Sequence, residues 1–278
     1  MKIVKWHAVE GNMQHLDGGA MFGHVPKVMW EKWIQPDQNN RIPLNCRALL
    51  VQTEDGRNFL FEAGIGAFFD PKLKERYGVT PNEHILLKNL EKIGVPHDKI
   101  NGLIISHLHS DHAGGLLSAY EDGPQRILFP NAKIYVGKRH WEMSQNPHPR
   151  EAASFISYLN KLLEETGRLV LIEGESHPDL DFGVNFLYSD GHSIGMMLAC
   201  IQLDTGPMLF VTDLAPGAAW VNLIVYMGYD RFPEQKYDEK SKIFDYILKN
   251  KGSLFFTHDP VMVHGVMQKD AQGKYFVK

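Results

Sequence analysis

Three histidines and one aspartate stand within six residues of this chain, in the run His107-Leu108-His109-Ser110-Asp111-His112. Imidazole nitrogens and a carboxylate oxygen are ligands that suit Zn, Mn, Fe or Co. The run contains no cysteine, which excludes a closed structural zinc site of the thiolate type. Gly114 and Gly115 follow shortly after it, and small residues let a backbone pack closely behind ligands. The pattern predicts a metal site with His107, His109, Asp111 and His112 as ligands.

Further ligands are expected later in the chain, because four ligands are too few for two metal ions. Three candidates each follow an apolar stretch with the pattern of a strand: His192 follows residues 184–189, Asp213 follows residues 208–212, and His258 follows residues 253–257. A single Asp or His after a strand is commonly a turn or cap residue. Their shared position at strand exits makes them candidate ligands together with the run.

The elements that position the run can be inferred from the spacing of apolar residues. A short buried strand at residues 102–106 leads directly into the run, which therefore lies at a strand-to-loop junction. Before it, Asp55-Gly56 supplies the turn of a β-hairpin between residues 47–53 and 58–62. Residues 16–23 contain three glycines and are expected to form an irregular loop.

Strands and helices alternate along the rest of the chain. Further strands are expected at residues 2–9, 133–136, 169–173, 184–189, 197–203, 208–212 and 253–257, and helices at residues 85–93, 150–166 and 237–250. Groups of antiparallel strands interspersed with helices predict an α/β (α+β) fold, with two sheets face to face and helices outside in a four-layer αββα sandwich. Residues 1–278 are expected to form one domain.

The composition limits the classes of partner. The chain has 278 residues, of which 44% are hydrophobic, so it can bury a large core. A net charge of -4 argues against a nucleic-acid footprint and favours a small-molecule substrate. No stretch approaches the roughly twenty apolar residues of a membrane span, and Lys5 and His7 interrupt the start before a signal-peptide core develops. Cys46 and Cys200 are expected to be buried thiols, so a cytoplasmic protein is expected.

With these residues in place, the chain resembles the metallo-β-lactamase-fold hydrolase superfamily. In that family a His-x-His-x-Asp-His loop is followed by a Gly-His, then a Thr-Asp or similar pair, then a late His, and the match here covers Leu49 to His258. The resemblance implies that His107, His109 and His192 hold one metal ion, that Asp111, His112 and His258 hold the other, and that Asp213 bridges them. Two divalent ions are therefore expected, with Zn first and Mn, Fe or Co as alternatives.

Three departures from other members narrow the subfamily. Many members have an Asp where this chain has Phe61-Glu62-Ala63-Gly64, so hydrogen-bonding support to the ligands would come from the longer carboxylate of Glu62. Cys200 falls in mid-strand and Asp213 occupies the bridging position, which disfavours β-lactam hydrolysis. The iron flavoproteins of this fold have Glu in place of the second His, whereas this chain has His109, which disfavours a diiron oxidoreductase.

The N-terminal part, residues 1–45, is expected to form a strand plus an extension that overhangs the active site. Its segment at residues 16–23 and the Trp30/Trp33 segment resemble the extension of lactonase-like and organophosphate-hydrolase-like members. Core packing and a contact in a homodimer are the alternative uses of such apolar residues. If the extension lines the pocket, the substrate has an apolar part.

The predicted function is hydrolysis of an ester or lactone bond, such as that of an acyl-homoserine lactone, by a metal-bridging hydroxide. Asp111 and Asp213 are the candidate catalytic residues, with Asp111 placed to accept the proton of the attacking water. Tyr188 or Tyr226 would assist the oxyanion, or be structural. The alternatives, in order, are a phosphotriester or phosphodiester hydrolase, a glyoxalase-type thioester hydrolase, and a non-catalytic metal-binding module.

Overall fold

The computed structural model describes residues 2–278, and their contacts divide the chain into two compact units. The first unit contains the residues up to Gln14 and Asn45–Gly183, and the second contains His15–Leu44 and Val184–Lys278. Each unit has its own sheet, its own helices and its own hydrophobic core. The single domain expected over residues 1–278 would contain both units and stays a prediction.

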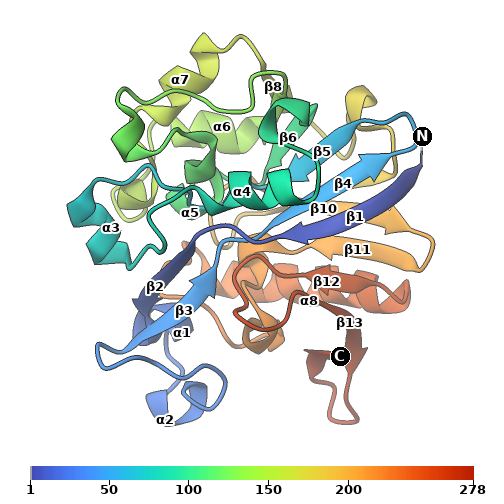
Figure 1. The fold of residues 1–278 in the computed structure, drawn as a ribbon. Helices are drawn as coiled ribbons and strands as arrows, with labels where there is room; N and C mark the ends of the chain where they lie inside the picture. Colours follow the sequence, from blue (N-terminus) through green and yellow to red (C-terminus); the bar gives the residue numbers. More distant parts are fainter. Residues whose placement is uncertain (1) are drawn as a thin grey trace. The chain divides into compact units, whose positions relative to one another are not determined.

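The first unit is built on a six-stranded mixed sheet in the order β1-β4-β5-β6-β7-β8 (Figure 1). Its strands are β1 (Ile3–Val9), β4 (Ala48–Thr53), β5 (Asn58–Phe61), β6 (Gly102–Ile105), β7 (Lys133–Gly137) and β8 (Leu169–Ile172). The pairs β1–β4 and β4–β5 are antiparallel, and the pairs from β5 to β8 are parallel. The predicted hairpin is confirmed: Gly56 in its turn has φ +83°, a conformation that glycine adopts without a Cβ clash.

The first unit also contains helices that follow the strands of this sheet. They are α3 (Pro71–Tyr77), α4 (Ile85–Lys92), α5 (Ser110–Ala113), α6 (Lys138–Ser144) and α7 (Leu159–Glu165), with short 3₁₀ helices η1 (His97–Lys99), η2 (Gly114–Leu116), η3 (Tyr120–Asp122), η4 (Ala152–Ser154) and η5 (Pro178–Leu180). Helix α4 packs on β1, and α6 packs on β7 and β8. Alternate residues of β4 are buried on opposite faces, Leu50 in the core under the helices and Leu49 on the other side. A sheet buried on both faces is what the inner layer of an αββα sandwich requires.

The helix expected over residues 150–166 is wrong in its first half. Only η4 and α7 form there, because the chain between them is extended at Phe155, which forms an isolated β-bridge with His109. The ring of Phe155 lies edge-on to that of His109, with 4.8 Å between ring centroids. Packing against the histidine run therefore overrides helical spacing in this segment.

The second unit has a six-stranded sheet in the order β14-β13-β12-β11-β10-β9, in which only β11 and β12 are parallel. Its strands are β9 (Val184–Ser189), β10 (Met196–Leu203), β11 (Gly206–Phe210), β12 (Ser253–Phe255), β13 (His264–Lys269) and β14 (Tyr275–Val277). A two-stranded ribbon, β2 (Met13–Asp17) and β3 (Arg41–Asn45), forms where the chain passes from one unit to the other. The sequence pattern did not reveal β13 and β14, or the helices α3 and α6 of the first unit.

Helix α8 (Pro233–Lys249) packs on β11 and β13 of the second unit, and starts at Pro233, four residues before the expected beginning. Proline suits the first turn of a helix because the N–H that it lacks would have no partner there. The unit also contains α1 (Gly18–Phe22), α2 (Lys27–Trp30), η6 (Thr212–Leu214) and η7 (Ala218–Val221). In its core, Phe22 stacks on Trp220, with 4.4 Å between ring centroids.

The irregular loop expected at residues 16–23 is instead mostly the short helix α1. Asp17 caps it by accepting a hydrogen bond from the backbone N–H of Ala20 (2.8 Å). Gly18 is needed for packing, because a Cβ there would lie 2.4 Å from the indole of Trp30. The glycine in this segment therefore serves a close helix-to-helix approach, which sequence spacing alone did not show.

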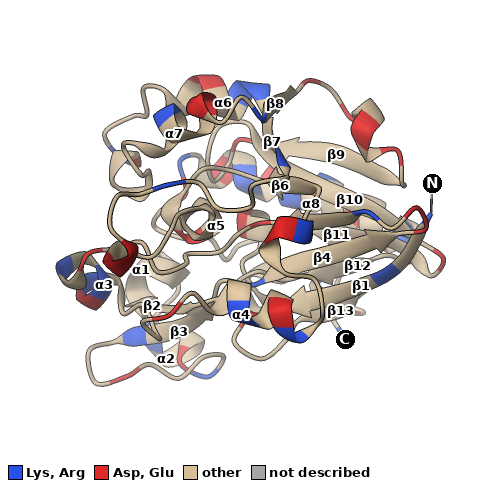
Figure 2. Cartoon of the chain, turned by 45° about the horizontal axis from the view of Figure 1, so that its top comes forward, with Lys and Arg blue, Asp and Glu red and all other residues tan. Residues whose placement is uncertain are grey.

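The distribution of charged residues and the setting of the two cysteines agree with what the composition suggested. Basic and acidic residues are interspersed on helices such as α3 and α4 (Figure 2). Cys46 and Cys200 are buried thiols that form no disulfide, as predicted. Within residues 2–278, each helix is too short or too polar to cross a bilayer.

Candidate metal centre

The predicted ligand run lies where β6 ends and α5 begins. His107 and His112 are fully buried, and His109 is nearly so. The centroid of the His107 ring is 4.5 Å from that of His109 and 4.0 Å from that of His112, so the three rings converge within the first unit. Gly115 lets the turn pack closely behind them, since a Cβ there would lie 1.9 Å from the carbonyl oxygen of Ala63.

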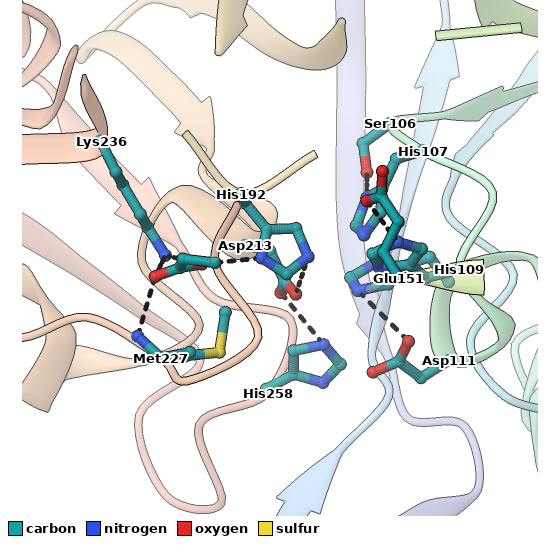
Figure 3. Close-up of polar contacts among 12 residues, drawn as sticks. Ser106, His107, His109, Asp111, Glu151, His192, Asp213, Met227, Lys236 and His258 are labelled. Carbon is teal, nitrogen blue, oxygen red and sulfur yellow. Dashed lines mark hydrogen bonds and ion pairs between the residues drawn. The ribbon is translucent and has the colours of Figure 1, made fainter. Parts of the chain in front are cut away.

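A polar side chain lies beside one nitrogen of each of these rings. Ser106 Oγ is 2.8 Å from His107 Nδ1 (Figure 3), and Glu62 Oε2 is 3.5 Å from His112 Nδ1. A partner on Nδ1 fixes the ring orientation and favours Nε2 as the nitrogen that binds a metal. For His109 the relation is reversed, because Glu151 Oε2 lies 3.6 Å from its Nε2. No sequence pattern pointed to Glu151, which follows the run by about forty residues.

Glu62 reaches the ligands in the way that its position before Ala63-Gly64 suggested. Its side chain is fully buried, Oε1 accepts a hydrogen bond from the backbone N–H of Ser106 (3.0 Å), and Oε2 faces His112. Its φ of +68° is uncommon for a residue with a side chain, and such backbone conformations concentrate at functional sites. Ligand atoms of Glu62, His107 and His112 lie within 4.8 Å of one another.

Asp111 is the most exposed of the four candidates in the first unit, with a side chain 20% accessible. Its Oδ2 accepts a hydrogen bond from the buried side chain of Gln14 (2.7 Å), and its Oδ1 lies 3.8 Å from His112 Nε2. The first contact fixes the orientation of the carboxylate. Gln14 was not identified from the sequence, because a lone glutamine in a strand has no distinguishing pattern.

The remaining three candidates belong to the second unit, and the structure brings them together. His192 follows β9, Asp213 lies in η6 after β11, and His258 follows β12. Asp213 Oδ2 is 3.1 Å from His192 Nε2, and its Oδ1 is 3.3 Å from His258 Nε2 (Figure 3). One carboxylate therefore offers a different oxygen to each ring, which is the arrangement that a bridging ligand needs. Thr212, just before it, has φ +40°, a strained conformation for a β-branched residue.

Behind His192 lies a buried charge pair that sequence patterns did not show. Asp230 Oδ1 is 2.8 Å from His192 Nδ1, and Lys236 Nζ lies 2.8 and 2.9 Å from the two oxygens of Asp230. Burial by itself would raise the pKa of Asp230, but the Lys236 ammonium and the His192 ring hold it below its usual value. One turn further along α8, burial lowers the pKa of Lys240 well below its usual value.

The two tyrosines considered as oxyanion partners occupy different settings. Tyr188 lies in β9 opposite Met197. Tyr226 stacks on His24, with 4.6 Å between ring centroids, and lines a surface pocket of 880 Å³ together with Ile224 and Phe232. A catalytic role for Tyr188 or Tyr226 stays a prediction.

A second pocket, of 580 Å³, adjoins the ligand run in the first unit. Ser110 of the run forms part of its wall, and the other lining residues are mainly aromatic or aliphatic. They include Phe68, Phe69, Tyr77, Tyr120, Phe155 and Tyr158. A pocket of this size and lining suits an apolar group of a small ligand.

With three buried imidazoles in one unit, and two imidazoles sharing a carboxylate in the other, the donor set fits divalent first-row metal ions. A closed cluster of uncharged imidazoles next to carboxylates is costly to bury unless it binds a cation or carries a proton. The residues present therefore fit the metals that the sequence suggests.

Comparison with known proteins also points to a metal-binding family. The family model of the metallo-beta-lactamase superfamily matches residues 41–258. An N-acyl homoserine lactonase of Bacillus sp is 27% identical over 244 residues, which cover 81% of this chain and 85% of the relative. The N-acyl homoserine lactonase AiiB of Agrobacterium fabrum is 26% identical over 139 residues, covering 49% of this chain and 48% of the relative.

Solved structures share the fold. A probable metal-dependent hydrolase from Staphylococcus aureus superposes with a TM-score of 0.87 at 27% identity, covering 100% of this chain and 99% of the other. AidC, a dizinc quorum-quenching lactonase solved with a product bound, superposes with a TM-score of 0.76 at 20% identity, covering 100% and 97%. The fold predicted from the sequence is confirmed.

Proposed function

Because the chain belongs to the metallo-beta-lactamase superfamily, we propose that it is a metal-dependent hydrolase that opens lactone rings, with N-acyl homoserine lactones as its substrate class. The observation that carries the proposal is the carboxylate of Asp213, which offers one oxygen to His192 and the other to His258. Relatives named as N-acyl homoserine lactonases, aligned over 81% of the chain, support the choice of bond.

We assign the metal ligands as the family resemblance implies. One ion would be held by His107, His109 and His192, the other by Asp111, His112 and His258, with Asp213 shared between them. The convergence of the three rings in the first unit and the contacts of Asp213 in the second support this assignment. We propose zinc as the native ion. Two divalent ions would lower the pKa of a water held between them and polarise the lactone carbonyl.

Asp111 has the geometry of a proton acceptor. Its side chain is partly accessible, and Gln14 fixes the carboxylate by donating to Oδ2. In the proposed reaction the carboxylate of Asp111 takes the proton that the attacking water loses. It then returns that proton to the ring oxygen, which leaves as the hydroxyl of the opened product.

The aromatic pocket beside Ser110 is the proposed place for the apolar part of the substrate. Phe155, which bridges His109, and Tyr158 belong to its wall. Because the pocket adjoins the ligand run directly, an acyl chain in it would leave a polar head group near the run. Burial of each CH₂ of such a chain contributes about 0.8 kcal/mol, so longer chains should bind more tightly.

A substrate panel tests the proposal. Purified protein loaded with zinc, and separately with manganese, is assayed on N-hexanoyl and N-decanoyl homoserine lactones, an aryl ester and an aryl phosphotriester, with bound metal measured in parallel. We expect lactone opening to dominate and KM to fall with chain length. Two bound ions with no turnover of either lactone would refute the proposal, and faster turnover of the phosphotriester would favour a phosphotriesterase instead. Asp213→Asn serves as the inactive control.

We also propose a homodimer in which the N-terminal extension forms part of the contact, and a cytoplasmic location. Val28 and Met29 are 66% and 50% exposed, and Trp33 is 43% exposed, which leaves an apolar surface on this segment. Light scattering on wild type and a Val28→Lys/Met29→Lys variant tests the dimer: the variant should be monomeric. A monomeric wild type would contradict it.

A further inference from the structure

We infer that Asp230 and Lys236 are positioning residues for His192: together they hold its proton on Nδ1 and aim Nε2 at Asp213. The inference rests on the proposed function and deepens it, because it names the residues that prepare one of the proposed ligands. Both residues lie outside the sequence motifs of the ligands, and both are essentially inaccessible to solvent.

The hydrogen bonds around Asp230 dictate which nitrogen of His192 carries the proton. Its Oδ1 is 2.8 Å from His192 Nδ1, and its Oδ2 accepts from the backbone N–H of Met227 (2.8 Å). Lys236 Nζ donates to both oxygens. A carboxylate in contact with a lysine ammonium only accepts hydrogen bonds, so the nitrogen facing it must be the N–H. Nε2 is then the nitrogen left for a metal ion, on the side of the ring that faces Asp213.

The other side of the ring shows why this matters. His192 Nε2 lies 3.1 Å from Asp213 Oδ2, on the side where Asp213 also reaches His258. A neutral imidazole binds a metal only through the nitrogen without a proton. The Asp230 carboxylate thus selects the tautomer that His192 needs as a ligand, and its negative charge makes Nε2 a stronger donor.

Helix α8 fixes the backbone of the same loop. Glu239 accepts hydrogen bonds from the backbone N–H groups of Asp190 (2.9 Å) and Gly191 (3.1 Å). Gly191 allows the helix to approach, because a Cβ there would lie 2.4 Å from Cβ of Lys236. The residue just before the helix adds a further contact to this loop, since Phe232 N–H donates to the carbonyl of Gly191 (2.9 Å). Ring and backbone of the His192 loop are therefore held from one segment.

The charge of Lys236 stabilises the Asp230 carboxylate that holds His192. A buried carboxylate without a cation would be strongly destabilised, whereas here the ammonium contacts both of its oxygens. Lys240 offers a matched comparison on the same helix. It is equally buried, but its ammonium donates to the backbone carbonyls of Asn222 (2.8 Å) and Val225 (3.0 Å) and not to Asp230.

Asp230→Asn is the decisive variant, because it keeps the shape of the side chain and replaces one acceptor oxygen with an NH₂ donor. The backbone N–H of Met227 cannot change its role, so the single oxygen of Asn must face it. The NH₂ group of Asn then faces His192 Nδ1, which becomes an acceptor and sends the proton to Nε2. The tautomer of His192 is thus expected to flip.

The experiment combines two measurements on the full chain. The tautomer is read in zinc-loaded protein from long-range ¹H–¹⁵N spectra with labelled histidine, with His192→Ala for assignment. Zinc affinity is measured by competition with a chromophoric chelator. We expect Asp230→Asn to move the His192 proton from Nδ1 to Nε2 and to weaken one of two zinc equivalents by about 10- to 100-fold. Lys240→Met should leave the tautomer unchanged and the zinc affinity within about twofold.

Each contrary outcome overturns the inference. These are an unchanged tautomer in Asp230→Asn, or a flipped tautomer with wild-type affinity for both zinc equivalents. If Asp230→Asn does not fold, the double variant Asp230→Asn/Lys236→Met removes both charges and carries the same expectation. Failure of the proposed function is distinguishable, because neither measurement involves turnover: protein that binds zinc but opens no lactone leaves both readings intact.

Discussion

Phe22 offers a quantitative test of how firmly the N-terminal extension is built into the second unit. Its side chain is fully buried and stacks on two indoles, with ring centroids 4.4 Å from Trp220 and 5.4 Å from Trp30. Removal of a buried Phe to Ala costs about 3–5 kcal/mol of the free energy of unfolding. Phe22→Leu keeps most of the volume and loses the two stacked pairs, each worth about 0.5–1.5 kcal/mol, so it should cost about 1–3 kcal/mol.

The assay is urea unfolding followed by tryptophan fluorescence, with the free energy of unfolding extrapolated linearly to water. Phe276→Ala is the matched control, because that ring is 41% exposed in β14 and its removal should cost less than about 1 kcal/mol. A loss below about 1 kcal/mol for Phe22→Ala would refute the reasoning. The extension would then be attached to the unit without contributing to its core.

Three further predictions concern the site and its surroundings. Gly115→Ala forces a Cβ to 1.9 Å from the Ala63 carbonyl oxygen and disturbs the hydrogen bond from the Gly115 N–H to the Gly64 carbonyl. Urea unfolding should therefore show that the free energy of unfolding falls by about 2–4 kcal/mol, and zinc titration should show weaker binding. An unchanged free energy of unfolding would contradict this close packing. Burial lowers the pKa of His84 below 6.5, so the unfolded state binds more protons and stability should fall as pH drops below about 6.5. In metal-free His84→Gln, unfolding measured from pH 7.5 to 5 should show a shallower slope, and an identical slope would exclude His84 as the cause. Burial raises the pKa of Cys200 to about 11, so iodoacetamide at pH 8 should modify it far more slowly than in unfolded protein, and rapid labelling by mass spectrometry would rule this out.

The sequence was most informative where a residue type and a strand end coincide. The strand before His107 and the hairpin turn at Gly56 were predicted closely, because apolar runs and an Asp-Gly pair are local signals. The candidates His192, Asp213 and His258 were recognisable by their shared position after strands, and the structure gathers these three within one unit.

What could not be predicted depends on contacts between distant residues. Asp230 and Glu151 approach histidines that lie 38 and about 40 residues away, and nothing in their immediate neighbours marks them. The helix over residues 150–166 failed for a related reason, since Phe155 pairs with His109 and this tertiary contact outweighs local helical spacing. The short helix at Gly18 required knowledge of the Trp30 ring, which only the fold supplies.

The division of the second unit between two distant stretches of chain has a consequence for synthesis. Phe22 and Trp30 leave the ribosome early, but Trp220, on which Phe22 stacks, is made almost two hundred residues later. At about 5–20 residues per second, this aromatic segment waits on the order of 10–40 seconds for its partner. During that interval the first unit can complete its own sheet, while the segment at residues 15–44 is exposed. Ribosome-bound chains stopped before Trp220 should therefore be the species that recruits chaperones.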